Sequence, residues 1–167
     1  MSCLGVHYAV SSQEAEALRR APTDVERLRF LQEEIEVKYF AELPEYLAES
    51  DRSWDGMHRT LSDGSLSWTG GQYPLNHIVL GGESLNCRDD YIVSLKTPEQ
   101  VVEIAAVLDD LDEAEFRRRY EGIDPRKYDG EIGEEDFVYT WSWFQGVRDL
   151  YLKAAHEGRH VVFAADQ

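Results

Sequence analysis

The residues best suited to chemistry lie in one central segment, Ser53-Trp54-Asp55-Gly56-Met57-His58. If a helix begins after Ser53, Asp55 and His58 are three residues apart and lie about 60° apart around its axis. A carboxylate in that position is able to orient the imidazole as in a general acid/base pair, with Glu83 as a further acid. The competing interpretation, which we favour, makes His58 a core residue and pairs Asp55 with Arg59 on the surface.

The same segment, with Tyr73 and the Gly81-Gly82 turn, is also suited to binding a small molecule. Trp54, His58 and Tyr73 would line a cleft, and a Gly-Gly turn is able to present backbone N–H groups to an anion. The turn matches none of the phosphate-loop, dinucleotide or nucleophile-elbow patterns. Glycines at a helix end followed by a turn are the more common meaning of this sequence.

The segment His156-Glu157-Gly158-Arg159-His160 matches the H-E-x-x-H pattern of zinc proteases. Such a site needs both histidines on one face of a continuous helix. Gly158 is expected to end the helix, and the residues after His160 are typical of a strand, so we do not expect the two histidines to share a metal. Cys3 and Cys87 are the only cysteines and have no paired spacing. We predict no metal site and no cofactor.

The charge of the chain excludes several classes of partner. Its 167 residues include 33 acidic residues against 17 Lys and Arg, a formal net charge of −16. This surplus repels nucleic acids and anionic lipid surfaces, and the single basic triplet, Arg117 to Arg119, spreads around a helix instead of forming a patch. We therefore expect no nucleic acid and no membrane partner. A basic protein partner is compatible with the charge, although solubility is its more common meaning.

The composition predicts one folded domain over residues 1–167. The chain is 43% hydrophobic and has 4 Trp, 9 Tyr and 6 Phe, enough apolar area for a core. It contains no internal repeat and no long linker. No signal peptide or membrane span fits the N-terminal residues, and two unpaired cysteines suit a reducing compartment, so we expect a cytoplasmic protein. The oligomeric state is not predicted.

Helices dominate the expected secondary structure. Four pairs of a small polar residue and an acid or amide three residues later mark helix starts: Ser11 with Glu14, Thr23 with Glu26, Thr97 with Gln100, and Asp112 with Glu115. The helix after Thr23 is expected to carry an apolar stripe that begins at Val25 and to stop before Pro44. The last helix is expected to open at residues 134–136 and to end at Gly158.

Three segments are expected to be strands. Leu4–Val10 alternates as in a half-buried strand, with His7 pointing away from the aliphatic side. Tyr91–Leu95 is a second strand, and His160–Ala165 reads as a strand buried on both faces. Pro74–Gly81 fits either a short helix or a strand, and its spacing favours the helix. We predict an α+β fold in which the first and last strands share a small sheet packed by several helices.

The central segment, Leu80-Gly81-Gly82-Glu83, Leu95–Val101 and Leu152–Ala155 together resemble the YfbM-like family of bacterial proteins of unknown function. The resemblance covers nearly the whole chain and implies a compact α+β domain that occurs as a free-standing small protein. It implies no activity, cofactor or catalytic residue. The H-E-x-x-H segment and the aromatic run at residues 139–144 depart from the family's pattern.

Three functions follow from these residues, in decreasing order of support. The first is a non-enzymatic interaction protein, an adaptor or an immunity-type neutraliser, whose acidic surface covers a basic partner and whose Trp143 is exposed for contact. The second is a small-molecule binding module built from Trp54, His58, Tyr73 and the Gly81-Gly82 turn. The third is an enzyme that uses Asp55 and His58 as acid and base.

Overall fold

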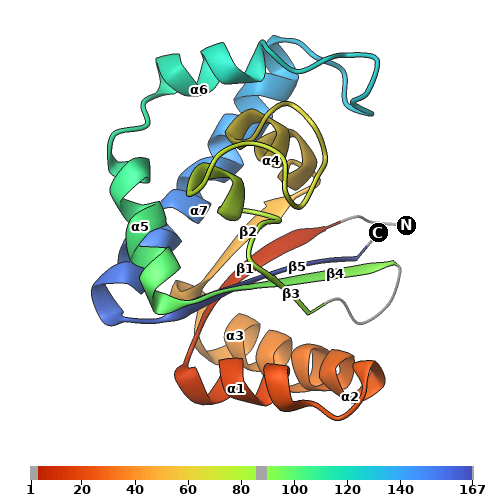
Figure 1. Ribbon diagram of the computed structural model, residues 1–167, viewed down its shortest axis with the longest axis vertical. Coiled ribbons are helices and arrows are strands. Elements are labelled where there is room, and N and C mark those ends of the chain that lie inside the picture. Colours follow the sequence, from red (N-terminus) through yellow and green to blue (C-terminus); the bar gives the residue numbers. More distant parts are fainter. Residues whose placement is uncertain (1–3, 86–89, 167) are drawn as a thin grey trace.

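The structure, a computed structural model, describes residues 4–85 and 90–166. A five-stranded sheet crosses the middle of the molecule, with every neighbouring pair antiparallel (Figure 1). In the spatial order β2-β1-β5-β4-β3, its strands are β2 (Leu47–Asp51), β1 (Gly5–Val10), β5 (His160–Asp166), β4 (Tyr91–Lys96) and β3 (Glu83–Ser84). The predicted α+β fold, with the first and last strands in one sheet, is confirmed.

The first and last strands form the centre of this sheet. Gly5 pairs with Ala165 and His7 with Phe163, so β1 and β5 run side by side over their whole length. Both strands are buried on both faces, which explains why β5 is an almost uninterrupted apolar run. The described ends of the chain therefore meet on one side of the molecule (Figure 1).

One layer of helices covers the lower face of the sheet in Figure 1. It consists of α1 (Ser12–Arg20) and of a rod formed by α2 (Asp24–Arg29), a π-helix (Phe30–Glu36) and α3 (Val37–Glu42). Leu31, Ile35 and Tyr39 of the rod pack with Tyr8 and Val93 of the sheet in one hydrophobic cluster. Seven residues of π-helix are unusual, because such geometry occurs mostly as single turns and often near functional sites.

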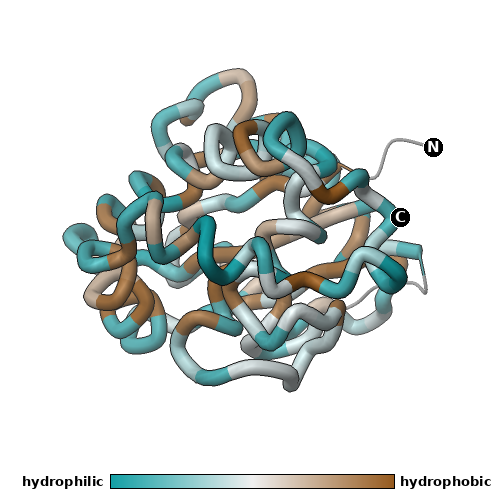
Figure 2. The backbone as a smooth tube through the Cα atoms, turned by 90° about the horizontal axis from the view of Figure 1, so that it is seen from above, coloured by the Kyte–Doolittle hydropathy of each residue, from teal (hydrophilic) through white to brown (hydrophobic). Residues whose placement is uncertain are grey.

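The opposite face carries the other helices. They are α4 (Trp54–Leu61), α5 (Pro98–Asp109), α6 (Glu113–Tyr120) and α7 (Glu134–Glu157), with short 3-10 turns at Pro44–Tyr46 and Leu75–His77. Phe116, Phe137 and Phe144 form the aromatic centre of this second cluster. Hydrophilic and hydrophobic stretches alternate along the helices (Figure 2), as expected when each helix has one buried side. None of the helices in the described ranges has the length and apolar composition needed to cross a bilayer.

The helix ends follow the predicted chemistry. Ser11 and Thr97 form complete capping boxes with Glu14 and Gln100, and the side chains of Thr23 and Asp112 accept the expected backbone N–H groups. Gly158 ends α7 in the left-handed conformation, at a φ of 66°. These starts and this stop are confirmed.

Several local predictions need correction. β1 is not half-buried: His7 is fully enclosed, because helices cover both faces of this central strand. Val25 is 65% exposed and lies outside the apolar stripe of its helix. Only Leu75–His77 of Pro74–Gly81 is helical, and turns follow it. The edge strands β2 and β3 escaped prediction because both are short and polar. Cys3 and Cys87 lie outside the described residues.

The aromatic centre of the upper cluster should dominate stability. We expect Phe144→Ala to lower the free energy of unfolding by about 3–5 kcal/mol, because the enclosed ring stacks on Phe116 with centroids 4.7 Å apart. Val138→Ala on the exposed side of the same helix should change it by less than about 0.5 kcal/mol. Urea denaturation of both variants measures the difference, and equal midpoints would contradict this packing.

Candidate functional site

The central segment forms helix α4, whose apolar side belongs to the core. Trp54, Met57, His58 and Leu61 are all at most 3% exposed. The Ser53 hydroxyl precedes the helix but donates to the Ser50 carbonyl oxygen, and it caps no N–H group. The Trp54 ring packs on Phe163 of β5, at 5.7 Å between centroids. This segment thus joins α4 to the sheet.

The three acid/base candidates each have a different partner. Asp55 Oδ1 accepts a hydrogen bond from Arg59 Nε at 2.5 Å. His58 Nε2 donates to the Ser67 carbonyl oxygen at 2.8 Å, and burial lowers the pKa of His58 to about 4. Glu83 forms an ion pair with Arg19 at 2.8 Å. The structure therefore does not join Asp55, His58 and Glu83 into one hydrogen-bonded group.

Tyr73, Gly81 and Gly82 line none of the hollows found among the described residues, whereas Trp54 lines the hollow at the start of α4. Tyr73 is 44% exposed and makes an edge contact with the His77 ring. The Gly81 N–H donates to the Asn76 carbonyl oxygen, so it is not free for an anion. Gly82, at a φ of 118°, leads the chain into the edge strand β3. These glycines shape a turn against neighbouring backbone, as their contacts show.

The two histidines of the H-E-x-x-H segment lie in different elements. His156 is in the last turn of α7, whereas His160 begins β5 after the left-handed Gly158. The prediction that Gly158 interrupts the helix is confirmed. In residues 4–85 and 90–166, no group of three or more His, Cys, Asp or Glu side chains is arranged to hold a metal ion.

A buried polar cluster lies between the sheet and the chain around residues 78–79. Lys96 is fully enclosed, and its Nζ donates to the Val79 carbonyl oxygen and to the Ser94 hydroxyl. No acid in the described part of the chain pairs with it, and burial lowers its pKa well below the usual range. His7 Nε2 donates to the Ile78 carbonyl oxygen at 3.0 Å, and burial together with Lys96 lowers the pKa of His7 to about 3. The cluster has no opening to solvent among the hollows described below.

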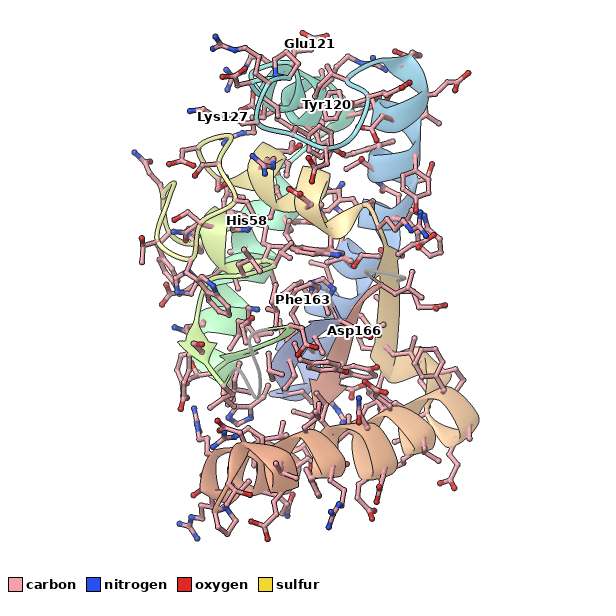
Figure 3. The ribbon with its side chains drawn as sticks, turned by 90° about the vertical axis from the view of Figure 1, so that its right-hand side faces the viewer. His58, Tyr120, Glu121, Lys127, Phe163 and Asp166 are labelled. Carbon is pink, nitrogen blue, oxygen red and sulfur yellow. The ribbon has the colours of Figure 1, made fainter. Side chains whose placement is uncertain are left out.

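A hollow of about 440 Å³ opens where the sheet meets the lower helices, on the side of the chain ends. Its floor is the lower face of β1, β5, β4 and β2, and its walls come from the π-helix, α3 and α7. Asp166 marks its position in Figure 3, above the rod of lower helices. We call it the sheet-end hollow. Its acidic and aromatic lining residues are Glu36, Glu49, Asp51, Asp166, Tyr8, Phe40, Tyr91 and Trp143.

The sheet-end hollow contains uncompensated negative charge. No Lys, Arg or His lines it, and none of its four carboxylates forms an ion pair within the described ranges. Burial raises the pKa of the Glu36 carboxyl; the Tyr91 hydroxyl, which donates to Glu36 at 2.7 Å, opposes this shift and the charge of Asp166 adds to it. Burial and the charges of Glu36 and Glu49 also raise the pKa of Tyr8. The hollow therefore favours a positively charged occupant.

Two further hollows extend this surface along α7. One lies around the α4 start and the other around the α7 start, and they share Asp136 and Tyr139. The Tyr139 ring contacts Trp143 of the sheet-end hollow, at 6.3 Å between centroids. Among the described residues, Arg52 is the one basic side chain in the lining of these three hollows, and it belongs to the hollow at the start of α4. Their acidic residues, which we call the acidic face, are Glu36, Glu49, Asp51, Asp55, Asp129, Glu131, Glu134, Glu135, Asp136 and Asp166.

A family model described as a domain of unknown function, DUF1877, matches residues 1–164. The chain belongs to this family. Its fold is similar to that of YfbM from Escherichia coli, a protein of unknown function with a crystal structure, at a TM-score of 0.68 and 18% identity. The similarity covers 97% of this chain and 99% of YfbM, and at this identity it establishes the fold alone. No curated protein matches the chain.

In this DUF1877 chain, sequence reasoning placed Trp143 at a binding surface but missed the other residues of the sheet-end hollow. These come from six elements, so no local motif joins them. One weak signal exists: Glu49 and Asp51 are two residues apart and therefore point to the same face of an edge strand. A short polar strand is difficult to recognise from sequence, so the shared face of Glu49 and Asp51 does not by itself predict a site.

The buried Lys96 predicts an unusual pH dependence. Its folded pKa is lowered, so between that pKa and about pH 10 the unfolded chain binds a proton that the folded chain does not, and stability rises with pH over this window. We expect Lys96→Met to be more stable at pH 7, and to flatten this rise by up to about 1.4 kcal/mol per pH unit between pH 7 and 9. In Lys96→Met the Val79 carbonyl oxygen keeps a donor, because the Ser94 hydroxyl also donates to it. Urea denaturation of the variant and the unmodified chain between pH 7 and 9 measures this change in slope.

The exposed Lys127 provides the matched control, because Lys127→Met removes the same charge from solvent. This control should keep the pH dependence of the unmodified chain. If Lys96→Met and Lys127→Met give the same slope, the Lys96 amine is charged in the folded protein and the prediction is wrong.

Proposed function

We propose that this protein is a non-enzymatic interaction module, of an adaptor or immunity type, that binds a basic segment of a partner protein through the acidic face. The observation that carries the proposal is the sheet-end hollow, which four carboxylates line with no basic side chain among the residues that the structure describes. An intramolecular salt bridge would remove the need for an external cation. Here the charge is left for a partner to neutralise.

The distribution of charge supports a protein segment over a small ion. The acidic face extends from Asp166 at the sheet end to Glu131 and Glu135 near the start of α7. Trp143 of the sheet-end hollow and Glu135 are separated along α7 by about 12 Å at 1.5 Å per residue. This exceeds the Debye length of about 8 Å at physiological salt, so separate cationic groups are needed to neutralise the two ends. Such a row also accelerates the encounter with a basic partner.

Aromatic side chains give this face contact area in addition to charge. Phe40 is 48% exposed at the mouth of the sheet-end hollow, and Trp143 and Tyr139 are half-buried beside it. Rings of this kind are enriched among the residues that contribute most to binding at protein interfaces. The proposed role of Trp143 in partner binding is therefore kept.

A small molecule is the second candidate occupant, favoured by the volume of the hollow, which lies in the range of small-molecule sites. The sheet-end hollow lies elsewhere than the cleft that the sequence predicts around Trp54, His58, Tyr73 and the Gly81-Gly82 turn. The acid/base hypothesis has less support, because Asp55 and His58 are engaged with Arg59 and with the Ser67 carbonyl oxygen.

The proposal is tested with a synthetic 12-residue peptide of alternating Arg and Ser. We expect the triple variant Glu49→Gln, Asp51→Asn, Glu135→Gln to weaken its binding at least about tenfold, measured by calorimetry near 0.15 M salt, because the lost charges line the acidic face. Asn is suited to position 51, where the φ is 45°.

The matched control removes the same number of charges elsewhere. Glu33, Glu34 and Glu42 are exposed on the lower helical rod and line none of the three hollows. Their triple Gln variant should bind within about threefold of the unmodified chain, since screening limits the effect of distant charges. Equal weakening by both triple variants would show non-specific attraction to a polyanion and contradict the proposal.

A further inference from the structure

The Tyr8 hydroxyl opens onto the sheet-end hollow and has no hydrogen-bond partner among the residues that the structure describes. The side chain is 1% exposed, and within residues 4–85 and 90–166 only ring contacts and nearby charges reach it. Hydroxyls of largely enclosed side chains are usually hydrogen-bonded, and here the partner has to come from outside the described chain, through the hollow. Because Tyr8 lines the hollow beside Glu36 and Glu49, an occupant of the hollow is able to supply the missing partner.

The polar groups around Tyr8 accept hydrogen bonds. The carboxylates of Glu36, Glu49 and Asp166 have only acceptor oxygens when ionised. Tyr91 already donates its proton to Glu36, so its remaining lone pairs also accept. An occupant must therefore bring several donors and positive charge. A guanidinium group has five N–H donors in a planar fork and no acceptor, which is the best match among side chains.

The aromatic lining distinguishes arginine from lysine. The exposed Phe40 and the half-buried Trp143 offer ring surface at the mouth of the hollow. A guanidinium stacks flat on such rings and is more weakly hydrated than an ammonium, so it loses less on entering a half-buried site. The chain already uses this contact elsewhere: the Arg117 guanidinium lies 3.7 Å from the centroid of the Phe137 ring.

Two irregular backbone segments converge on the same hollow. Glu36 is the last residue of the π-helix, and Asp51 has a φ of 45°, a left-handed conformation that is uncommon outside glycine. Rare conformations of this kind occur often where a binding site is built. Both residues contribute a carboxylate to the hollow.

From the unpartnered Tyr8 hydroxyl, the acceptor lining and the aromatic mouth, we infer that the sheet-end hollow holds the guanidinium group of one arginine side chain of the partner. This inference rests on the proposed function and names the side chain of the partner that the hollow would select. Tyr8, Glu36 and Asp166 accept the N–H groups, and Phe40 with Trp143 contacts the flat side of the guanidinium. The rest of the acidic face binds other basic residues by charge alone.

The test compares the Arg-Ser peptide with a Lys-Ser peptide of equal length and charge, by calorimetry near 0.15 M salt. The unmodified chain should bind the Arg peptide about tenfold more tightly. Tyr8→Phe should weaken the Arg peptide about three- to tenfold, the net value of one ordinary hydrogen bond, and leave the Lys peptide within about twofold. Its melting temperature should not fall, because the free protein loses no hydrogen bond.

Glu135→Gln is the matched control, because Glu135 belongs to the acidic face but lies outside the sheet-end hollow. It should weaken both peptides by the same factor. Equal affinity for the two peptides, with no effect of Tyr8→Phe, would overturn the inference while the charge-removal experiment still supports the proposed function. If neither peptide binds, the proposed function itself is wrong.

A third probe, arginine capped as its N-acetyl amide, separates a free guanidinium compound from a partner's side chain. It should bind at least about a hundredfold more weakly than the Arg peptide and show the same loss in Tyr8→Phe. Binding as tight as that of the peptide would mean that the occupant is a free small molecule, and would overturn the assignment to a partner protein.

Discussion

Burial of β1 and β5 on both faces is the constraint on which the rest of the structure depends. Both central strands carry apolar side chains on alternate sides, so each face of the sheet must be covered. The rod of lower helices and the α4–α7 layer provide that cover and create two separate hydrophobic clusters. The polar groups that become enclosed, such as His7 and Lys96, then find backbone oxygens in the turn at residues 78–79 as acceptors.

The same constraint explains where the candidate site lies. The sheet-end hollow opens between Phe40 of the lower rod and the last residues of β2 and β5, Asp51 and Asp166. Aromatic side chains that would otherwise be core, above all Tyr8 and Tyr91, therefore line a hollow. The polar groups at this edge of the core are acidic, and no basic side chain in residues 4–85 and 90–166 lines the hollow with them.

Much of this fold could be predicted from local signals, and the site could not. Capping pairs, the stop at Gly158 and the apolar run of β5 depend on neighbours within a few residues, so one sequence reveals them. The burial of His7 and Lys96 depends on what covers the sheet, which no local pattern encodes. The central segment drew attention because its residues are chemically distinctive. Their types are explained by packing, as the Trp54 contact with Phe163 shows.

The pairing of His7 with Phe163 has a consequence for how this chain is made. On a ribosome, β1 is synthesised first, and its central neighbour emerges only after the whole of α7. Until then the edge of β1 that β5 will occupy offers unpaired N–H and C=O groups next to apolar side chains, a surface prone to association. Completion of the sheet must therefore follow synthesis of β5, so this edge of β1 stays unpaired until the last strand has emerged.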